Sequence, residues 1–163
     1  MSKVMADMSA FLDPTFVINL YKSFSKQMEQ KDYLLREIEK IGAVVRAIMG
    51  RITGNEQEEA ITVGHEFEQT TEWMLQETRF SLTKVLTLDK PLLKDYIASF
   101  RGFNVANMEL LAELFYQTGI RYPEGQREKF LQKALQLYEL CNETDHTFSF
   151  ERERKMNEVR EVL

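Results

Sequence analysis

The chain has 163 residues, a formal net charge of −5, 44% hydrophobic residues and 29% charged residues. These are values of a folded globular protein that can bury its own core. The acidic balance argues against nucleic-acid binding, which needs a clustered basic face. The single cysteine, Cys141, excludes an internal disulfide and favours a reducing compartment. No apolar run resembles a signal peptide or a membrane span, so we expect a cytoplasmic protein without membrane contact.

Apolar residues follow helical spacing along nearly the whole chain, and Pro and Gly are sparse, at 3 and 7. The sequence therefore predicts an all-α protein, a helical array or irregular bundle of about six to seven helices, in a single domain over residues 1–163. Within it we expect an additional N-terminal helix in 1–31 and a heptad-patterned helix in 32–54. An acidic helix with connecting helices should occupy 55–102, and a helical hairpin with a capping helix 103–163.

The first long helix should begin at "DPTF", with Asp13 as the cap and Pro14 at the first helical position. Extending the apolar pattern of the next helix backwards meets polar residues at Lys31 and Gln27. It then meets apolar residues again, at Phe24, Leu20 and Val17. Either one long helix carries a polar interruption, or two helices meet near Gln27–Asp32, and the second alternative is favoured because Asp32 could cap a new helix.

An apolar stripe with alternating spacings of four and three follows, ended by Gly50 and Gly54. Such spacing is typical of a heptad seam. The seam could pack within its own chain or mediate self-association, which leaves a homodimer as an open alternative. Its members are Leu34, Ile38, Ile41, Val45, Ile48 and Ile52.

The segment 55–79 contains seven glutamates, and its only strong base is Arg79. His65 shares one predicted helix face with Glu58, Glu68 and Glu72, at offsets of seven, three and seven. A metal needs ligands from more than one side, so a second helix would have to contribute. A solvated acidic face is the alternative, which leaves His65, Glu68 and Glu72 as weak metal-ligand candidates.

Shorter helices are expected next, separated by Ser81 and "TLDKP". "PLLKDYIASF" should end before Gly102, and "NMELLAELFYQTG" should end at Gly119, followed by a loop, "IRYPEGQ". The last helix, "SFERERKMNEVREVL", has a narrow apolar stripe of Met156, Val159 and Leu163, as expected of a capping helix.

Two consecutive helices, in 107–119 and 129–143, have apolar faces too wide for packing on one side only. They resemble a tetratricopeptide repeat, although its Trp and its closing Pro are absent and the two halves are further apart than in a regular repeat. The resemblance implies a closely packed helical hairpin. The matching positions are Met108, Leu111, Ala112, Phe115, Ala134, Tyr138 and Cys141.

A broader resemblance runs from about Asp32 to the C-terminus. "DYLLREIEKIGAVVRAIMG" and "LLAELFYQTG" are similar to an uncharacterised bacterial family of small all-helical proteins with a tetratricopeptide-like C-terminal half. This family has no assigned activity, so the resemblance implies a fold and no catalytic or cofactor-binding residues.

No pattern of a catalytic site is present. Cys141 lies on an apolar face, where a packing role is expected, and His146 follows Glu143 by three residues without the second Glu-x-x-His of a di-iron bundle. We therefore expect a non-enzymatic interaction module or scaffold without a cofactor, whose partner is an unidentified protein or peptide. The alternative is a metal- or small-ligand-binding protein that uses His65 and nearby glutamates.

Overall fold

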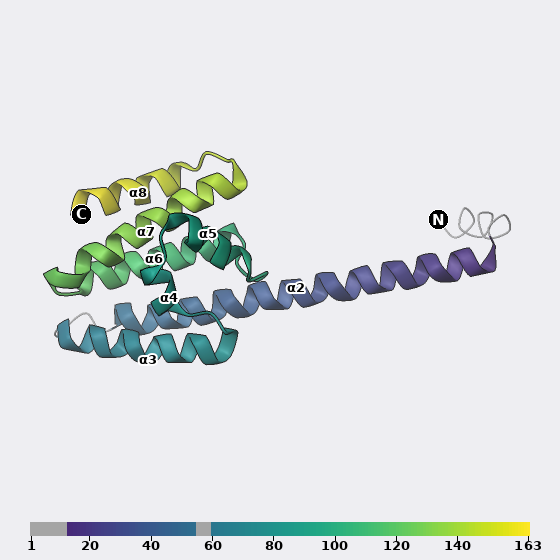
Figure 1. Cartoon of the computed structure of the whole chain (residues 1–163), viewed down its shortest axis with the longest axis horizontal. Coiled ribbons are helices and arrows are strands. Elements are labelled where there is room, and N and C mark those ends of the chain that lie inside the picture. Colours follow the sequence, from purple (N-terminus) through teal and green to yellow (C-terminus); the bar gives the residue numbers. More distant parts are fainter. Residues whose placement is uncertain (1–12, 55–59) are drawn as a thin grey trace. The chain divides into compact units, whose positions relative to one another are not determined.

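The computed structural model describes residues 13–54 and 60–163. Within these ranges the chain forms seven helices and no strand (Figure 1), which confirms the predicted all-α fold. The helices are α2 (Pro14–Gly54), α3 (Ala60–Thr78), α4 (Leu82–Thr87), α5 (Lys90–Ala98), α6 (Val105–Arg121), α7 (Glu124–Asp145) and α8 (Phe150–Val162).

Helix α2 begins where the sequence predicts, since the backbone N–H of Thr15 donates to Oδ1 of Asp13 at 3.1 Å. The favoured break near Gln27–Asp32 is wrong, because α2 continues through it to Gly54. Residues 15–41 contain neither Pro nor Gly, and Gln and Lys are good helix formers. A change in the apolar pattern can therefore end a packing seam without ending the helix.

The chain divides into two compact units, Met1–Arg36 and Glu37–Leu163. The sequence predicts one domain with an N-terminal element ending at residue 31. All of the core residues found in the described chain belong to the second unit. They include Ile41, Val45, Ile48 and Ile52, so this part of the predicted seam packs within its own chain.

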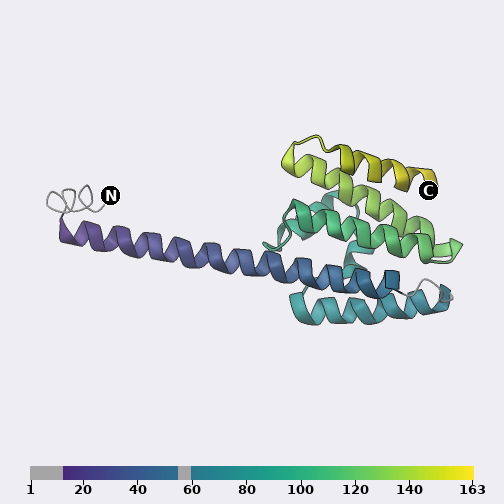
Figure 2. The same cartoon turned by 180° about the vertical axis from the view of Figure 1, so that it is seen from behind.

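The second unit is an array of helices. Residues 37–54 of α2 lie beside α3, and α6, α7 and α8 follow in order, as both Figure 1 and Figure 2 show. Helix α3 also contacts α6, and the short α4 contacts both α3 and α7. Each inner helix is therefore covered on two sides, which explains the wide apolar faces of α6 and α7.

Polar side chains set the starts of four helices. The side chains of Ser81, Asp89, Asn104 and Ser149 accept hydrogen bonds from backbone N–H groups of α4, α5, α6 and α8, at 3.1, 3.1, 2.9 and 3.2 Å. The boundaries predicted from Ser81 and from "TLDKP" are thus confirmed.

Gly119 does not end α6, as the sequence predicts, but lies within it. A Cβ at this position would lie 3.0 Å from Leu131 Cδ2 and 3.0 Å from Phe130 Cβ, so Gly119 permits the close approach of α7. The predicted loop at 120–126 shrinks to Tyr122 and Pro123 between the two helices. The additional residues between the two halves of the hairpin therefore lie in the longer helices α6 and α7 and not in a loop. Every position matched to the tetratricopeptide pattern is buried.

The segment before α6 is fixed to α2 by one buried amide. Asn107 Nδ2 donates to the backbone oxygens of Ile38 and Gly102, at 2.9 and 2.7 Å. Gly102 itself packs so tightly that a Cβ there would lie 2.9 Å from the backbone oxygen of Glu37. The start of the second unit is therefore held against α6 through backbone contacts.

Candidate functional site

The N-terminal part of α2 exposes a run of large apolar side chains. Tyr21 is 76% exposed, Met28 64% and Phe24 59%, in a helix where offsets of three and four place residues on one face. We name this surface the α2 apolar face. It consists of Phe16, Val17, Leu20, Tyr21, Phe24, Met28, Leu34 and Leu35.

The opposite side of the same segment is mainly polar, with Lys22, Lys26 and Glu29 among its residues, and with Ile18 and Tyr33 as exceptions. The segment is therefore amphipathic. A contiguous exposed apolar surface of this size on a folded protein usually marks an interaction site. The α2 apolar face is the candidate functional site.

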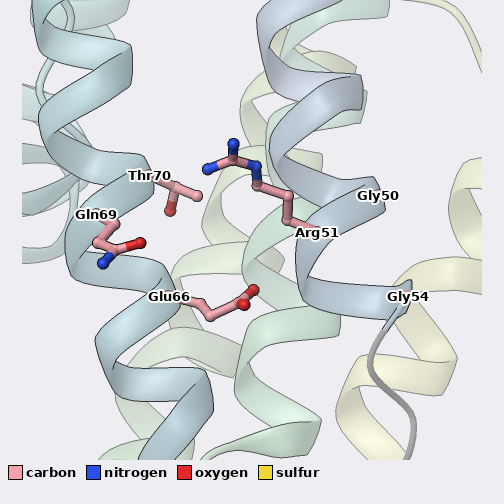
Figure 3. A pocket seen from close by; sticks show the side chains of 6 residues that line it. All are labelled: Gly50, Arg51, Gly54, Glu66, Gln69 and Thr70. Carbon is pink, nitrogen blue, oxygen red and sulfur yellow. The ribbon is translucent and has the colours of Figure 1, made fainter.

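A small open pocket of about 190 Å³ lies between the C-terminal part of α2 and α3 (Figure 3). Arg51 reaches from α2 towards α3, and Glu66 reaches from α3 towards α2. The Arg51 guanidinium also lies 5.7 Å from the centre of the Trp73 ring. The pocket presents both charges, so it has no strong preference for an anion or a cation. Its lining residues are Gly50, Arg51, Gly54, Glu66, Gln69 and Thr70.

A larger cavity of about 410 Å³ lies among α6, α7 and α8. Glu113 accepts hydrogen bonds there from Lys155 Nζ at 2.5 Å, Gln117 Nε2 at 2.7 Å and Tyr138 Oη at 3.0 Å. Burial alone would raise the pKa of Glu113, but these three hydrogen bonds outweigh it and hold its pKa below the ordinary value. Burial and the Glu113 charge raise the pKa of Tyr138.

Arg152 of α8 lies beside this cavity with only 4% of its surface exposed. It donates to Glu109 Oε1, Asp145 Oδ2 and Asn142 Oδ1, each at 2.7 Å. The hydrogen bond from Arg152 holds the pKa of Asp145 below its ordinary value. Arg152 and Lys155 of α8 are thus paired with acidic groups of α6 and α7, and these pairs brace the array.

The metal-ligand candidates of the sequence lie on the exposed side of α3. His65, Glu68 and Glu72 are all exposed, and His65 Nε2 shares a hydrogen bond of 2.9 Å with Gln69 Nε2. Glu58 lies outside the described residues. Within 13–54 and 60–163, no group of three His, Cys, Asp or Glu residues is arranged to hold a metal ion.

The structure also places the Glu143–His146 pair and Cys141, which the sequence analysis considered as possible reactive groups. His146 follows α7 in the left-handed conformation, with φ of 52°, and its backbone N–H donates to the Asn142 oxygen at 3.2 Å. The Glu143 of the Glu-x-x-His pair forms an ion pair with Lys90 at 2.8 Å. Cys141 is buried, as predicted, and burial raises the pKa of its thiol to about 12.

The sequence pattern showed Val17, Leu20 and Phe24 as an apolar stripe, but the α2 apolar face was not predicted as an interaction site, although a signal for it existed. Val17, Tyr21, Phe24 and Met28 alternate in spacing by four, three and four, a second seam displaced from the one that continues into the core. The sequence interpretation also missed Arg152, because nothing in "ERERK" distinguishes this residue from the charged residues around it in the sequence.

No protein family, curated protein or solved structure matches the chain. Among the helices that the structure describes, none combines the length and the apolar character needed to cross a membrane.

Proposed function

We propose that the chain is a non-enzymatic protein–protein interaction module of the cytoplasm and that its contact surface is the α2 apolar face. The observation that carries this proposal is the exposure of Tyr21, Phe24 and Met28 on one side of an amphipathic helix. Helices of this kind bind by laying their apolar side against an apolar partner surface. The second unit would serve as the scaffold, with α6 and α7 as a tetratricopeptide-like hairpin.

Energetics supports this assignment. Fully burying a side chain such as Phe or Met stabilises a complex by roughly 1.5–3 kcal/mol. More than half of the surface of Phe24 and of Met28 is available for burial in a partner. Large side chains near the centre of an interface usually dominate its affinity. We therefore expect Phe24 and Met28 to be the main contributors.

The experiment compares three immobilised full-length proteins in partner capture from native extract of the source cells at low salt. They are the wild type, the double variant Phe24→Glu/Met28→Glu and the control Lys26→Glu. The double variant and the control change the net charge equally, by −2, but Lys26 lies on the polar side of the helix.

Wild type and Lys26→Glu should retain the same proteins, including any endogenous copies of the chain, and the double variant should lose them. If the double variant retains the wild-type set, the α2 apolar face is no interaction surface and the proposal is overturned. The metal-binding alternative keeps only the spacing of His65, Glu68 and Glu72 in its favour.

A further inference from the structure

We propose that the occupant of the α2 apolar face is the same face of a second copy of the chain, in an antiparallel pair of helices centred on residue 26. This inference rests on the proposed function, because it names the partner of the same surface. Three features of the face favour a second copy, namely the spacing of its apolar residues, the position of one lysine and its exposed area.

The apolar face contains a heptad seam. Tyr21, Met28 and Leu35 are seven residues apart, and Val17 and Phe24 form the second row of the same seam. This alternation lets two helices pack side by side along their length. The next position of the second row is Lys31, the single charged residue in the seam between Val17 and Leu35.

Lys31 discriminates between the two orientations. In a parallel pair in register, Lys31 faces Lys31 of the second copy, and like charges at a desolvated contact repel. In an antiparallel pair centred on residue 26, a residue that follows position 26 by a given number of residues faces the residue of the second copy that precedes position 26 by the same number. Lys31 then faces Tyr21 of the second copy, whose aromatic ring attracts a cation.

The same antiparallel arrangement matches the remaining layers. Phe24 faces Met28 of the second copy, a favourable sulfur–aromatic pair. Val17 faces Leu35 of the second copy, and Leu20 lies beside its Leu34. Each layer therefore joins apolar side chains, apart from the layers in which Lys31 meets a tyrosine.

The C-terminal limit of the pair follows from where the exposed residues end, and centring on residue 26 gives the largest number of layers within that limit. A shift by one heptad towards the C-terminus would oppose Val17 to Gly42, which is buried in the second unit beside Asn107. Centring on residue 26 instead uses only residues 17–35 as layers. These all lie within the unit Met1–Arg36.

The area available on this face reaches the lower limit of stable dimer interfaces. Seven side chains of the face are 36–76% exposed, from Leu34 to Tyr21. Six of them lie within residues 17–35, and with about 100 Å² available on each, the pair buries at most roughly 600 Å² per copy and roughly 1,200 Å² in total. Stable, specific interfaces bury about 1,200–2,000 Å².

The first test measures the mass of the purified full-length protein by sedimentation equilibrium. Wild type and Lys26→Glu should be dimers. Phe24→Glu/Met28→Glu should raise the dimer dissociation constant by about 100-fold or more, because it places charges in the central layers. Circular dichroism should show unchanged helicity, since both replaced side chains are exposed.

The second test measures orientation with one spin label per chain, at Asn19→Cys or at Lys26→Cys. The two positions are seven residues apart and occupy equivalent sites around the helix. Cys141 should not compete for the label, because it is buried and its thiol pKa is raised. In the antiparallel pair the two labels at position 19 are displaced along the axis by about 21 Å, whereas those at position 26 are level.

A longer label–label distance at position 19 than at position 26 supports the proposal. Equal distances would indicate a parallel pair and overturn it. A monomeric wild type would refute the proposal that a second copy of the chain binds the α2 apolar face. The partner-capture experiment then shows whether the proposed function fails as well. A monomer that still captures proteins through Phe24 and Met28 has another partner, whereas one that captures none through them fails on both counts.

Discussion

Replacing Gly102 with alanine should destabilise the second unit strongly. The added Cβ would lie 2.5 Å from Ile41 Cδ1 and 2.9 Å from the backbone oxygen of Glu37, and real Cβ contacts are essentially never closer than 3.0 Å. The Ile41 methyl can rotate away, but the Glu37 carbonyl belongs to the backbone of α2. The segment before α6 must therefore withdraw and strain the Asn107 hydrogen bonds.

Overpacking costs typically about 1–3 kcal/mol, and a weakened buried hydrogen bond adds about 1 kcal/mol. We expect the free energy of unfolding to fall by about 3 kcal/mol, which lowers the melting temperature by about 6–12 °C for a protein of this size. Urea unfolding followed by circular dichroism measures the effect.

Gly50→Ala is the matched control, because Gly50 lies inside α2 and no atom lies within 4 Å of its added Cβ. It should raise the stability by about 1 kcal/mol, since alanine is the better helix former. If Gly102→Ala unfolds at the same urea concentration as the wild type, the close contact between this segment and α2 does not exist in solution.

Three further outcomes are expected. Arg152→Met should lower the free energy of unfolding by about 2 kcal/mol, whereas the exposed Arg154→Met should change it by less than about 0.5 kcal/mol; equal effects in urea unfolding would contradict the bracing role. Glu113→Gln should destabilise the protein at pH 7, with the difference from wild type shrinking as the pH falls below about 4.5, because the pKa of Glu113 is lowered in the fold and its contribution is lost on protonation. A constant difference across a pH series would refute this. Cys141 should resist alkylation at pH 8 in the native protein and react in urea, as mass spectrometry can show.

The helical class could be predicted because its signals are local. The spacing of apolar residues and caps such as Asp13 and Ser81 act within one or two turns of their own helix. The two wide apolar faces also predicted correctly that α6 and α7 lie inside the array.

The errors concern features that depend on distant contacts. Gly119 has the composition of a helix end, but the neighbouring α7 gives it a packing role within α6. Gln27 and Lys31 interrupt a seam, yet nothing in the backbone ends the helix there. Local rules cannot distinguish the end of a packed face from the end of a helix.

The candidate site shows the same limit. Extending the core seam backwards from Leu34 met two polar positions and then Phe24, Leu20 and Val17, but it left out Tyr21 and Met28, which complete a second seam. Only the exposure of the side chains in the folded protein distinguishes an apolar stripe that forms the core from one that can bind a partner. The burial of Arg152 likewise depends on Glu109 and Asp145, which lie on two other helices.

The position of Trp73 gives the molecule a local spectroscopic reporter. It is the only tryptophan, and it lies next to Arg51 at the contact between α2 and α3. Its fluorescence therefore reports on this end of the array, whereas circular dichroism averages over all helices. Helix α8, which contacts α7 at the other end of the array, contributes to circular dichroism but lies far from Trp73 in the order of helices. If the fluorescence and circular dichroism curves coincide during unfolding, the array unfolds as one cooperative body. If the fluorescence changes first, α3 separates before the other helices.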